Sequence, residues 1–297
     1  MVKVLVTGGS GFLGKRLQLV EPDWIYLSSE DVDLLSLEDC LRVFEEHSPD
    51  SVVHLAGKVG GIKDNSEKPA EFFYQNIIMN ANVVHAAYLS GVKRLLASLS
   101  TCAFPDSAWP YPFKEEALFA GPPAKTNFPY GFSKRALYTQ ICAYRDQYNL
   151  NYTTFSPSNL YGPGDYFDEQ KSHFVAAMIR RMHEAGDGES VEFWGTGHPL
   201  RQQLYVDDLA KAIPLLLDLH DGDFPIIVAP DENLSVREMI LIFDSIIKKN
   251  LKISFNGKLD GQFRKDGCND KFMHLIPDFK FTPFEEGIRK TYEWYTA

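Results

Sequence analysis

Residues 2–14 read VKVLVTGGSGFLG, and this stretch decides the fold class. Val2–Val6 is an aliphatic run of the kind that forms a strand buried on both faces of a sheet. Gly8, Gly11 and Gly14 follow it. After a strand, such glycines allow a sharp turn, a close approach of backbone to a pyrophosphate, and tight packing of helix on strand. The stretch therefore predicts a dinucleotide site whose phosphates bind the N–H groups of the next helix.

Short aliphatic runs alternate with longer amphipathic stretches along most of the chain. Further strands are predicted at Trp24–Leu27, Ser51–Leu55, Arg94–Leu99, Tyr152–Phe155 and Pro225–Val228. Helices are predicted at Leu37–His47, Ala70–Ser90, Tyr130–Gln147 and Leu204–Leu219. Buried strands joined by helices indicate a parallel sheet covered on both faces. With right-handed crossovers this is an α/β fold with a Rossmann-type doubly wound sheet.

The composition changes after Leu160, where residues 161–199 become rich in Gly, Asp and His. This later part has predicted helices at Phe174–Ala185, Leu234–Lys249 and Pro283–Tyr295 and a strand at Lys252–Phe255. We predict a smaller, discontinuous C-terminal α/β substrate domain. It would comprise about 163–199 plus 231–297, and the dinucleotide-binding domain would comprise 1–162 plus about 200–230.

Charge and composition exclude several classes of function. Thirty basic and 40 acidic residues give a net charge of -10, and no Lys/Arg block exceeds two residues. We therefore expect no nucleic-acid or anionic-membrane partner. Apolar runs such as Ala212–Leu219 fall short of the ~20 residues that span a bilayer, and no signal peptide is predicted. The four cysteines lack metal-type spacing and are too few for a disulfide framework, which favours a cytoplasmic chain without a metal.

Tyr130 and Lys134 are spaced i, i+4, so they share one face of a predicted helix. A hydride-transfer enzyme needs an acid for the carbonyl oxygen, and a nearby ammonium favours a lower tyrosine pKa. Ser100 follows the strand Arg94–Leu99, where a hydroxyl would project into the ligand crevice and bind the carbonyl. The alternative for Ser100 and Thr101 is ordinary turn capping.

Longer motifs accompany these residues. They are His54–Ile62 (HLAGKVGGI), Leu99–Asp106 (LSTCAFPD), Asn159–Pro163 (NLYGP), Ser172-His173, Trp194–Gly197 (WGTG), Tyr205–Leu209 (YVDDL) and Asp260–Lys265 (DGQFRK). With them the chain resembles the extended short-chain dehydrogenase/reductases that act on nucleotide sugars, and within that group the GDP-L-fucose synthase family. The resemblance implies 3,5-epimerisation of GDP-4-keto-6-deoxy-D-mannose followed by reduction of the C4 ketone.

By this resemblance, Cys102 and His173 carry the epimerisation. The C4 ketone acidifies the C3 and C5 protons, so a base can remove one and an acid can return one on the other face. Cys102 would share the crevice with Ser100 if the strand continues extended. A thiol whose pKa is lowered suits the base, and histidine suits the acid. The alternatives are a buried structural cysteine and a histidine that caps its helix.

The resemblance also implies the binding residues. Those around the cofactor are Gly8, Gly11, Phe12, Leu13, Gly14, Ser29, Leu55 and Ala56, with Tyr130 and Lys134. Those around the substrate are Thr101, Asn159, Arg181, Trp194, Arg201 and Lys265. Arg201 and Lys265 would bind the pyrophosphate, and Asn159 the nucleotide diphosphate. Arg181 would serve the substrate while Arg180 faces solvent, and the reverse assignment of these two arginines stays open. The alternative for each binding residue is a surface ion pair or core packing.

The cofactor preference has two opposing signals. Glu30, in the loop Ser28–Asp31, suits a free 2′-hydroxyl and favours NAD(H). The resemblance implies NADP(H), which we favour, with NAD(H) as the alternative. It also implies a homodimer formed through the helices Ala70–Ser90 and Tyr130–Gln147. Two other functions stay open, namely the same chemistry on another GDP-4-keto-deoxyhexose or deoxyheptose, and a nucleotide-binding regulatory protein without catalysis.

Overall fold

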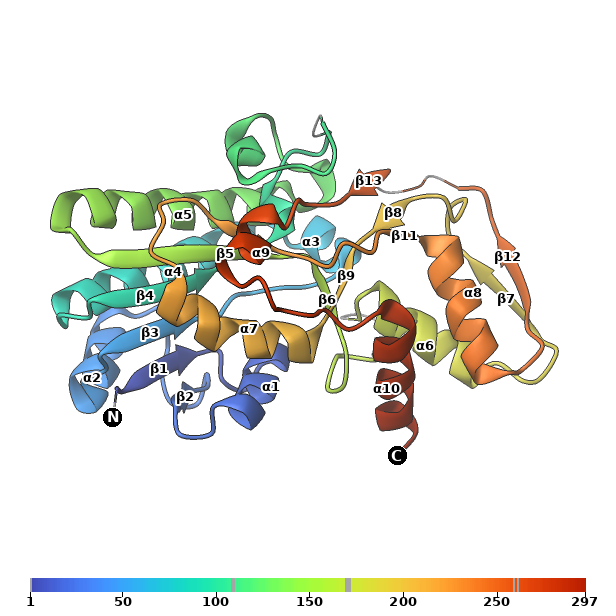
Figure 1. Cartoon of the computed structure of the whole chain (residues 1–297), viewed down its shortest axis with the longest axis horizontal. Coiled ribbons are helices and arrows are strands. Elements are labelled where there is room, and N and C mark those ends of the chain that lie inside the picture. The colour runs from blue at the N-terminus through green and yellow to red at the C-terminus, as the bar shows by residue number, and fades with distance from the viewer. Residues whose placement is uncertain (1, 108–109, 169–171, 259, 261) are drawn as a thin grey trace.

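The computed structural model describes residues 2–107, 110–168, 172–258, 260 and 262–297, apart from the side chains of Ile62 and Lys63. Its centre is a six-stranded parallel sheet in the order β10-β5-β4-β3-β1-β2 (Figure 1). The strands are β1 (Val4–Thr7), β2 (Ile25–Leu27), β3 (Ser51–His54), β4 (Arg94–Ser98), β5 (Asn151–Pro157) and β10 (Ile226–Val228). The strand order reverses between β1 and β3, which is where ligands bind in such sheets.

Helices cover both faces of the sheet (Figure 1). One face holds α2 (Leu37–His47), α4 (Pro69–Leu89) and α5 (Phe128–Tyr148), and the other holds α1 (Phe12–Val20), α7 (Val206–Leu219) and α9 (Asp270–Leu275). Successive side chains of a strand point to opposite faces, so Leu5 joins the first layer and Val6 the second. The predicted doubly wound fold is confirmed.

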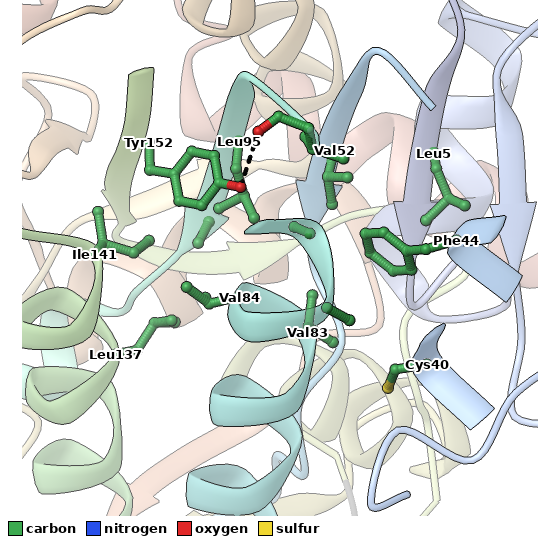
Figure 2. Packing of buried hydrophobic residues seen from close by; sticks show 14 of the residues in the cluster. Leu5, Cys40, Phe44, Val52, Val83, Val84, Leu95, Leu137, Ile141 and Tyr152 are labelled. Atoms are coloured by element: carbon green, nitrogen blue, oxygen red, sulfur yellow. Dashed lines mark hydrogen bonds between the residues drawn. The ribbon is translucent and has the colours of Figure 1, made fainter. Parts of the chain in front are cut away.

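The layer beneath α4 and α5 is closely packed (Figure 2). Phe44, Leu95 and Tyr152 are each fully buried there, and Tyr152 Oη donates a hydrogen bond to Val92 O at 3.0 Å. Burying one large apolar side chain contributes roughly 1.5–3 kcal/mol. This layer holds the carboxyl ends of β3, β4 and β5 in fixed positions beneath the site.

A second lobe has its own apolar cluster, built around Met178, Phe243 and Ile288. Its helices are α6 (Phe174–Glu184), α8 (Val236–Ile247) and α10 (Phe284–Thr296). Its strand pairs are β12 (Lys252–Phe255) with β7 (Ser190–Phe193), and β8 (Leu200–Arg201) with β11 (Leu234–Ser235) and β13 (Arg264–Lys265). Between the lobes, β6 (Asn159–Tyr161) pairs with β9 (Gln203–Tyr205).

The predicted domain boundaries stay a prediction. Phe272 of α9, with Phe279 and Phe281 after it, packs on the large sheet and not on the second lobe. Thr282 is still held to α7, because its N–H and hydroxyl both donate to the buried carboxylate of Asp208, and the chain joins the apolar cluster of the second lobe at Phe284. Residues 270–281 would therefore lie on the sheet's side of any division.

Two predicted helices begin later than the sequence indicated. The helix predicted from Leu204 begins at Val206, because Gln203–Tyr205 is extended, buried and paired with β6. The helix predicted from Leu234 begins at Val236, where Ser235 and Glu238 form a capping box. Propensity alone does not mark the first start, since β9 depends on a partner distant in the sequence, whereas the Ser235 and Glu238 pattern is a local signature of the second.

Two short helices were not predicted, namely α3 (Ile62–Glu67) and α9. None of the helices that the structure describes combines the length and apolar character needed to cross a lipid bilayer.

Candidate active site

The carboxyl ends of β1, β3 and β4 meet at one edge of the sheet. The chain leaves β1 into the glycine loop and leaves β4 into a 3-10 turn, η1 (Thr101–Ala103). α5 packs against that turn, and β13 of the second lobe reaches it with Lys265. The predicted residues of the first lobe thus gather where the strand order reverses.

The glycine loop has the geometry that close approach of a phosphate requires. Gly8 has φ +77°, in the region that favours glycine, and a Cβ there would lie 2.8 Å from Ala56 N. α1 begins at Phe12 with Gly11 as its N-cap, so the N–H groups of its first turn are free of intrahelical partners. A Cβ on Gly14 would collide with the carbonyls of Gly8 and Gly9. These residues fit a bound pyrophosphate, with Leu55 and Ala56 directly against Gly8.

The loop after β2 forms a compact polar turn. Ser28 donates from its N–H and its hydroxyl to Asp31 Oδ2, both at 2.7 Å, and its Oγ accepts from Glu30 N at 3.1 Å. The hydrogen bonds from Ser28 lower the pKa of Asp31. Ser29 and Glu30 are exposed at the tip. The loop is therefore a polar turn held by its own side chains, with Glu30 exposed at the tip.

Tyr130 and Lys134 are both buried in the first half of α5. Lys134 Nζ donates to Ser98 O at 2.7 Å and lies 5.9 Å from the centroid of the Tyr130 ring. Burial lowers the pKa of Lys134 to about 8. The expected lowering of the tyrosine pKa is not found. Burial raises the pKa of Tyr130, the charge of Cys102 adds to this, and a hydrogen bond with Ser100 opposes it.

A raised pKa keeps the Tyr130 hydroxyl protonated, which suits a proton donor to a carbonyl oxygen. The Lys134 ammonium donates its hydrogen bond to a strand carbonyl and not to the phenol. Gly131 lets the helix approach the turn, because a Cβ there would lie 2.7 Å from Cys102 O.

The chain was expected to continue in extended form through Cys102, and it does not. Thr101–Ala103 forms η1, and Ser100 caps it by accepting a hydrogen bond from Cys102 N at 3.1 Å. A residue at a strand's end turns when its backbone finds a local cap. The capping alternative for Ser100 is therefore realised, and Thr101 is buried within the turn.

Lys265 lies against the thiol. Its Nζ donates to Cys102 Sγ at 2.9 Å and to Asn159 Oδ1 at 3.3 Å. Burial acts to raise the pKa of Cys102, but the charge and hydrogen bond of Lys265, with hydrogen bonds from Ser100 and Asn127, lower it. Lys265 was expected on a pyrophosphate, and here it favours a thiolate.

His173 lies at the N-cap of α6, as the sequence predicted. Its Nδ1 is 3.7 Å from Asp165 Oδ1, and the histidine side chain is 45% exposed while the carboxylate is 1% exposed. The contact with Asp165 raises the pKa of His173, burial opposes this, and the charge of Cys102 contributes to the increase. The two groups expected to exchange protons with the substrate therefore influence each other electrostatically.

The remaining substrate residues lie farther along the second lobe. Arg201 is half-buried and donates from Nη1 to Leu200 O at 2.7 Å. Arg181 is exposed, with Nη2 donating to Glu192 O at 2.5 Å, and Trp194 after β7 is 82% exposed. Arg180 does not face solvent as expected, since its side chain is 18% exposed. Adjacent residues of a helix point in different directions, so a shift of one position in the sequence decides which of the two arginines faces the interior.

One residue of this site, Asp165, was not predicted, whereas His54 is a buried structural residue beside it. Asp165 lies in a Gly-Pro-Gly turn, and only its place eight residues before His173 could have drawn attention to it. His54 is fully enclosed behind the glycine loop, where Nδ1 meets Thr7 Oγ1 at 2.7 Å and Nε2 meets Asn80 Oδ1 at 3.0 Å. Because an amide oxygen only accepts, His54 carries its proton on Nε2 and accepts from Thr7.

Comparison with known proteins agrees with this geometry. Residues 4–228 match the NAD dependent epimerase/dehydratase family, and the chain belongs to that family. The crystal structure of a GDP-L-fucose synthetase from Naegleria fowleri bound to NADP superposes with a TM-score of 0.92 at 32% identity, covering 99% of this chain and 92% of that one.

The likeness extends to a particular group within the family. A GDP-L-fucose synthase of Dictyostelium discoideum is 34% identical over 303 residues, which cover 98% of this chain and 94% of that one. The chain thus groups with the GDP-L-fucose synthases, which confirms the resemblance stated from its motifs. A GDP-6-OMe-4-keto-L-xylo-heptose reductase from Campylobacter jejuni is also similar, with a TM-score of 0.91 at 25% identity, covering 99% of this chain and 97% of that one.

Proposed function

We propose that this protein converts GDP-4-keto-6-deoxy-D-mannose to GDP-L-fucose by epimerisation at C3 and C5 followed by reduction at C4. The full-length similarity to GDP-L-fucose synthases supports the substrate. The order of the steps follows from chemistry. The C4 ketone makes the neighbouring protons acidic and reduction removes the ketone, so both inversions must precede the hydride transfer.

The epimerisation uses the residues at the junction of the two lobes. Cys102 as thiolate removes a proton from the carbon beside the ketone, and protonated His173 returns one to the opposite face. Ser100, next to Cys102, donates a hydrogen bond to the C4 oxygen and stabilises the negative charge that develops there. The configuration of a carbon inverts when its proton is removed from one face of the ring and a proton is returned to the other face.

The reduction uses the residues of α5. The glycine loop would hold NADPH, which would supply the hydride for C4. Tyr130 donates its phenolic proton to the C4 oxygen, which its raised pKa permits only as the oxygen becomes strongly basic. Lys134, held on Ser98 O, supplies positive charge near the phenol. The loop of Gly8, Gly11 and Gly14 would bind the pyrophosphate of the cofactor.

One observation carries the proposal. Lys265 Nζ lies 2.9 Å from Cys102 Sγ, in a turn that packs directly against the helix carrying Tyr130. A reductase that only transfers hydride has no use for an activated thiol beside its tyrosine. We therefore assign two reactions to this one crevice.

The test is to mix the enzyme with GDP-4-keto-6-deoxy-D-mannose and NADPH or NADH, follow coenzyme oxidation, and identify the sugar by NMR. Formation of GDP-L-fucose supports the proposal, and the better coenzyme shows whether Glu30 has changed the preference for NADPH. Cys102→Ser should lose the C3 and C5 solvent exchange. Normal turnover to GDP-L-fucose in that variant would remove Cys102 from the mechanism.

A second candidate is the same chemistry on a GDP-linked 4-keto-heptose. The similarity to the Campylobacter jejuni heptose reductase favours it, at 25% identity over nearly the full chain. A panel of GDP-4-keto sugars assayed under one set of conditions separates the two candidates. Faster coenzyme oxidation with the heptose than with the 6-deoxyhexose would replace the first proposal.

We also propose a homodimer and a cytoplasmic location. Phe73, Phe128 and Phe132 are exposed on α4 and α5 and line an apolar depression of about 420 Å³ with Pro69 and Pro129, a surface suited to helix packing. The four free cysteines favour a reducing compartment, which would preserve the Cys102 thiol. Sedimentation of Phe132→Glu against the wild type tests the dimer, and an unchanged mass would place the interface elsewhere.

A further inference from the structure

We propose that Asp165 and Lys265 are positioning residues that hold the two epimerising groups in their working protonation states, with Asp165 keeping His173 protonated and Lys265 keeping Cys102 as thiolate. The inference rests on the proposed function and adds to it a reason why one acid–base pair can serve two inversions in succession.

Lys265 reaches the thiol from the other lobe. It belongs to β13, which pairs with β8, and its Nζ contacts both Cys102 Sγ and Asn159 Oδ1. An ammonium group at hydrogen-bond distance favours the anionic form of sulfur. Asn159 Oδ1 accepts a second hydrogen bond from the same ammonium and so fixes its direction.

Asp165 has the corresponding role at the histidine. Its Oδ1 accepts a hydrogen bond from Tyr166 N at 2.8 Å and lies 3.7 Å from His173 Nδ1. Its Oδ2 is buried and has no hydrogen-bond partner within the described part of the chain. A buried carboxylate oxygen without a partner is costly, and an imidazolium is the kind of partner that relieves the cost.

The proton balance explains why both partners are needed. In one inversion a C–H bond breaks and an S–H bond forms at Cys102. The electron pair is held as the enolate of the C4 ketone, and His173 then loses its N–H proton to the opposite face of the same carbon. The enzyme is left with a neutral thiol and a neutral imidazole. Inversion of the second carbon requires the thiol proton to leave and the imidazole to regain one through solvent, and Lys265 and Asp165 favour these two changes.

Other charged groups face the pair as well. Cys102 interacts with Lys265, His173 and Tyr130, and its charge acts on Arg201. His173 is influenced by Asp165 and Cys102, which raise its pKa, and by Lys265, which lowers it. Removing Asp165 should therefore lower the histidine pKa, and removing Lys265 should raise the cysteine pKa.

The first experiment needs no substrate. The rate of Cys102 carboxymethylation by iodoacetate is followed by mass spectrometry between pH 5 and 10 in the wild type, Lys265→Met and the control Lys93→Met, an exposed lysine distant from the site. Lys265→Met should move the midpoint for Cys102 upward by about one pH unit, the usual size of such a charge effect, and Lys93→Met should not. An unmoved midpoint would overturn the role of Lys265.

The second experiment measures solvent deuterium exchange at C3 and C5 of saturating GDP-4-keto-6-deoxy-D-mannose against pH. Asp165→Asn preserves the acceptor for Tyr166 N, and Asp278→Asn at an exposed position is the matched control. Asp165→Asn should move the alkaline limb of the profile, where His173 loses its proton, to lower pH by about one unit. Lys265→Met should move the acidic limb, where the Cys102 thiolate forms, to higher pH. A uniform loss of rate with both limbs in place would overturn the inference.

The two failures can be told apart. If the wild type neither exchanges deuterium nor oxidises NADPH with this sugar, the proposed function fails, and the carboxymethylation profile still tests Lys265. If the wild type does both and the variant profiles keep their shape, only the inference fails. A lysine that merely binds the pyrophosphate would raise KM for the sugar and leave the limbs unmoved.

Discussion

Gly14→Ala tests the link between the glycine loop and cofactor binding. Gly14 lies in the first turn of α1, directly over the turn that follows β1. A Cβ there would lie 2.6 Å from Gly9 O and 2.8 Å from Gly9 C, and would also collide with Gly8 O. Ordinary van der Waals contact begins at 3.4 Å, and the atoms in the way belong to the backbone. The loop must therefore move away from Gly14 by roughly 1 Å.

The expected magnitudes differ for stability and for binding. Overpacking of this kind costs about 1–3 kcal/mol, while alanine gains about 1 kcal/mol over glycine as a helix former, which leaves a modest net loss of stability. Binding suffers more. A shift of roughly 1 Å takes an N–H···O bond beyond its range, and a hydrogen bond to a charged phosphate is worth about 1.5–3 kcal/mol. Losing one such bond weakens NADPH binding by roughly 10- to 100-fold.

Fluorescence titration of NADPH gives the dissociation constant, and thermal melting without ligand gives the stability. Gly121→Ala is the control, because its Cβ would meet only Pro105 at an ordinary 3.4 Å. The control should bind NADPH as the wild type does. An unchanged dissociation constant in Gly14→Ala, with a melting temperature near that of the control, would refute the assignment of the phosphates to this loop.

Three further predictions follow from individual side chains. Tyr130→Phe should abolish NADPH oxidation while leaving C3 and C5 deuterium exchange within a fewfold of the wild type, and loss of both would show that the residue does more than protonate C4. Glu30→Lys should shift the ratio of kcat/KM toward NADPH and away from NADH by roughly tenfold, since it replaces repulsion of a 2′-phosphate with attraction, and an unmoved ratio would place the ribose elsewhere. Burial lowers the pKa of His220 from 6.5 to about 4 and that of His54 to about 3. As the pH falls, the unfolded chain therefore binds protons at these histidines before the folded chain does. The contribution of the two neutral histidines to the free energy of unfolding is complete above about pH 6.5 and is lost as the pH falls toward 4. In thermal melts His220→Gln should lose less stability over this range than the wild type, and an equal loss would contradict the reasoning.

The parallel sheet was predictable because most of its strands are short runs of aliphatic, β-branched or aromatic residues, which can be recognised without knowing which strands lie beside them. The ranges Leu37–His47 and Lys252–Phe255 agree with α2 and β12 residue for residue. The two-residue strands β8, β11 and β13 were not predictable. A strand of two residues has no internal pattern and exists only because a partner distant in the sequence lies beside it.

The candidate site divides in the same way. The glycine loop and the Tyr130 and Lys134 pair are local patterns, and the i, i+4 spacing places both side chains on one helix face in any fold. The direction of Lys134 toward Ser98 O, and the raised pKa of Tyr130, follow from burial and from neighbours on other elements. No local pattern encodes these.

The sequence by itself therefore determined the class of fold, the strand–glycine–helix unit and the residue types available for chemistry, because these depend on contacts within a few residues. Only the tertiary structure decided that Lys265, 163 residues after Cys102, lies on its thiol and that buried Asp165 faces His173. The protonation state of a side chain depends on the charges and the solvent around it, and the folded chain alone brings those charges together.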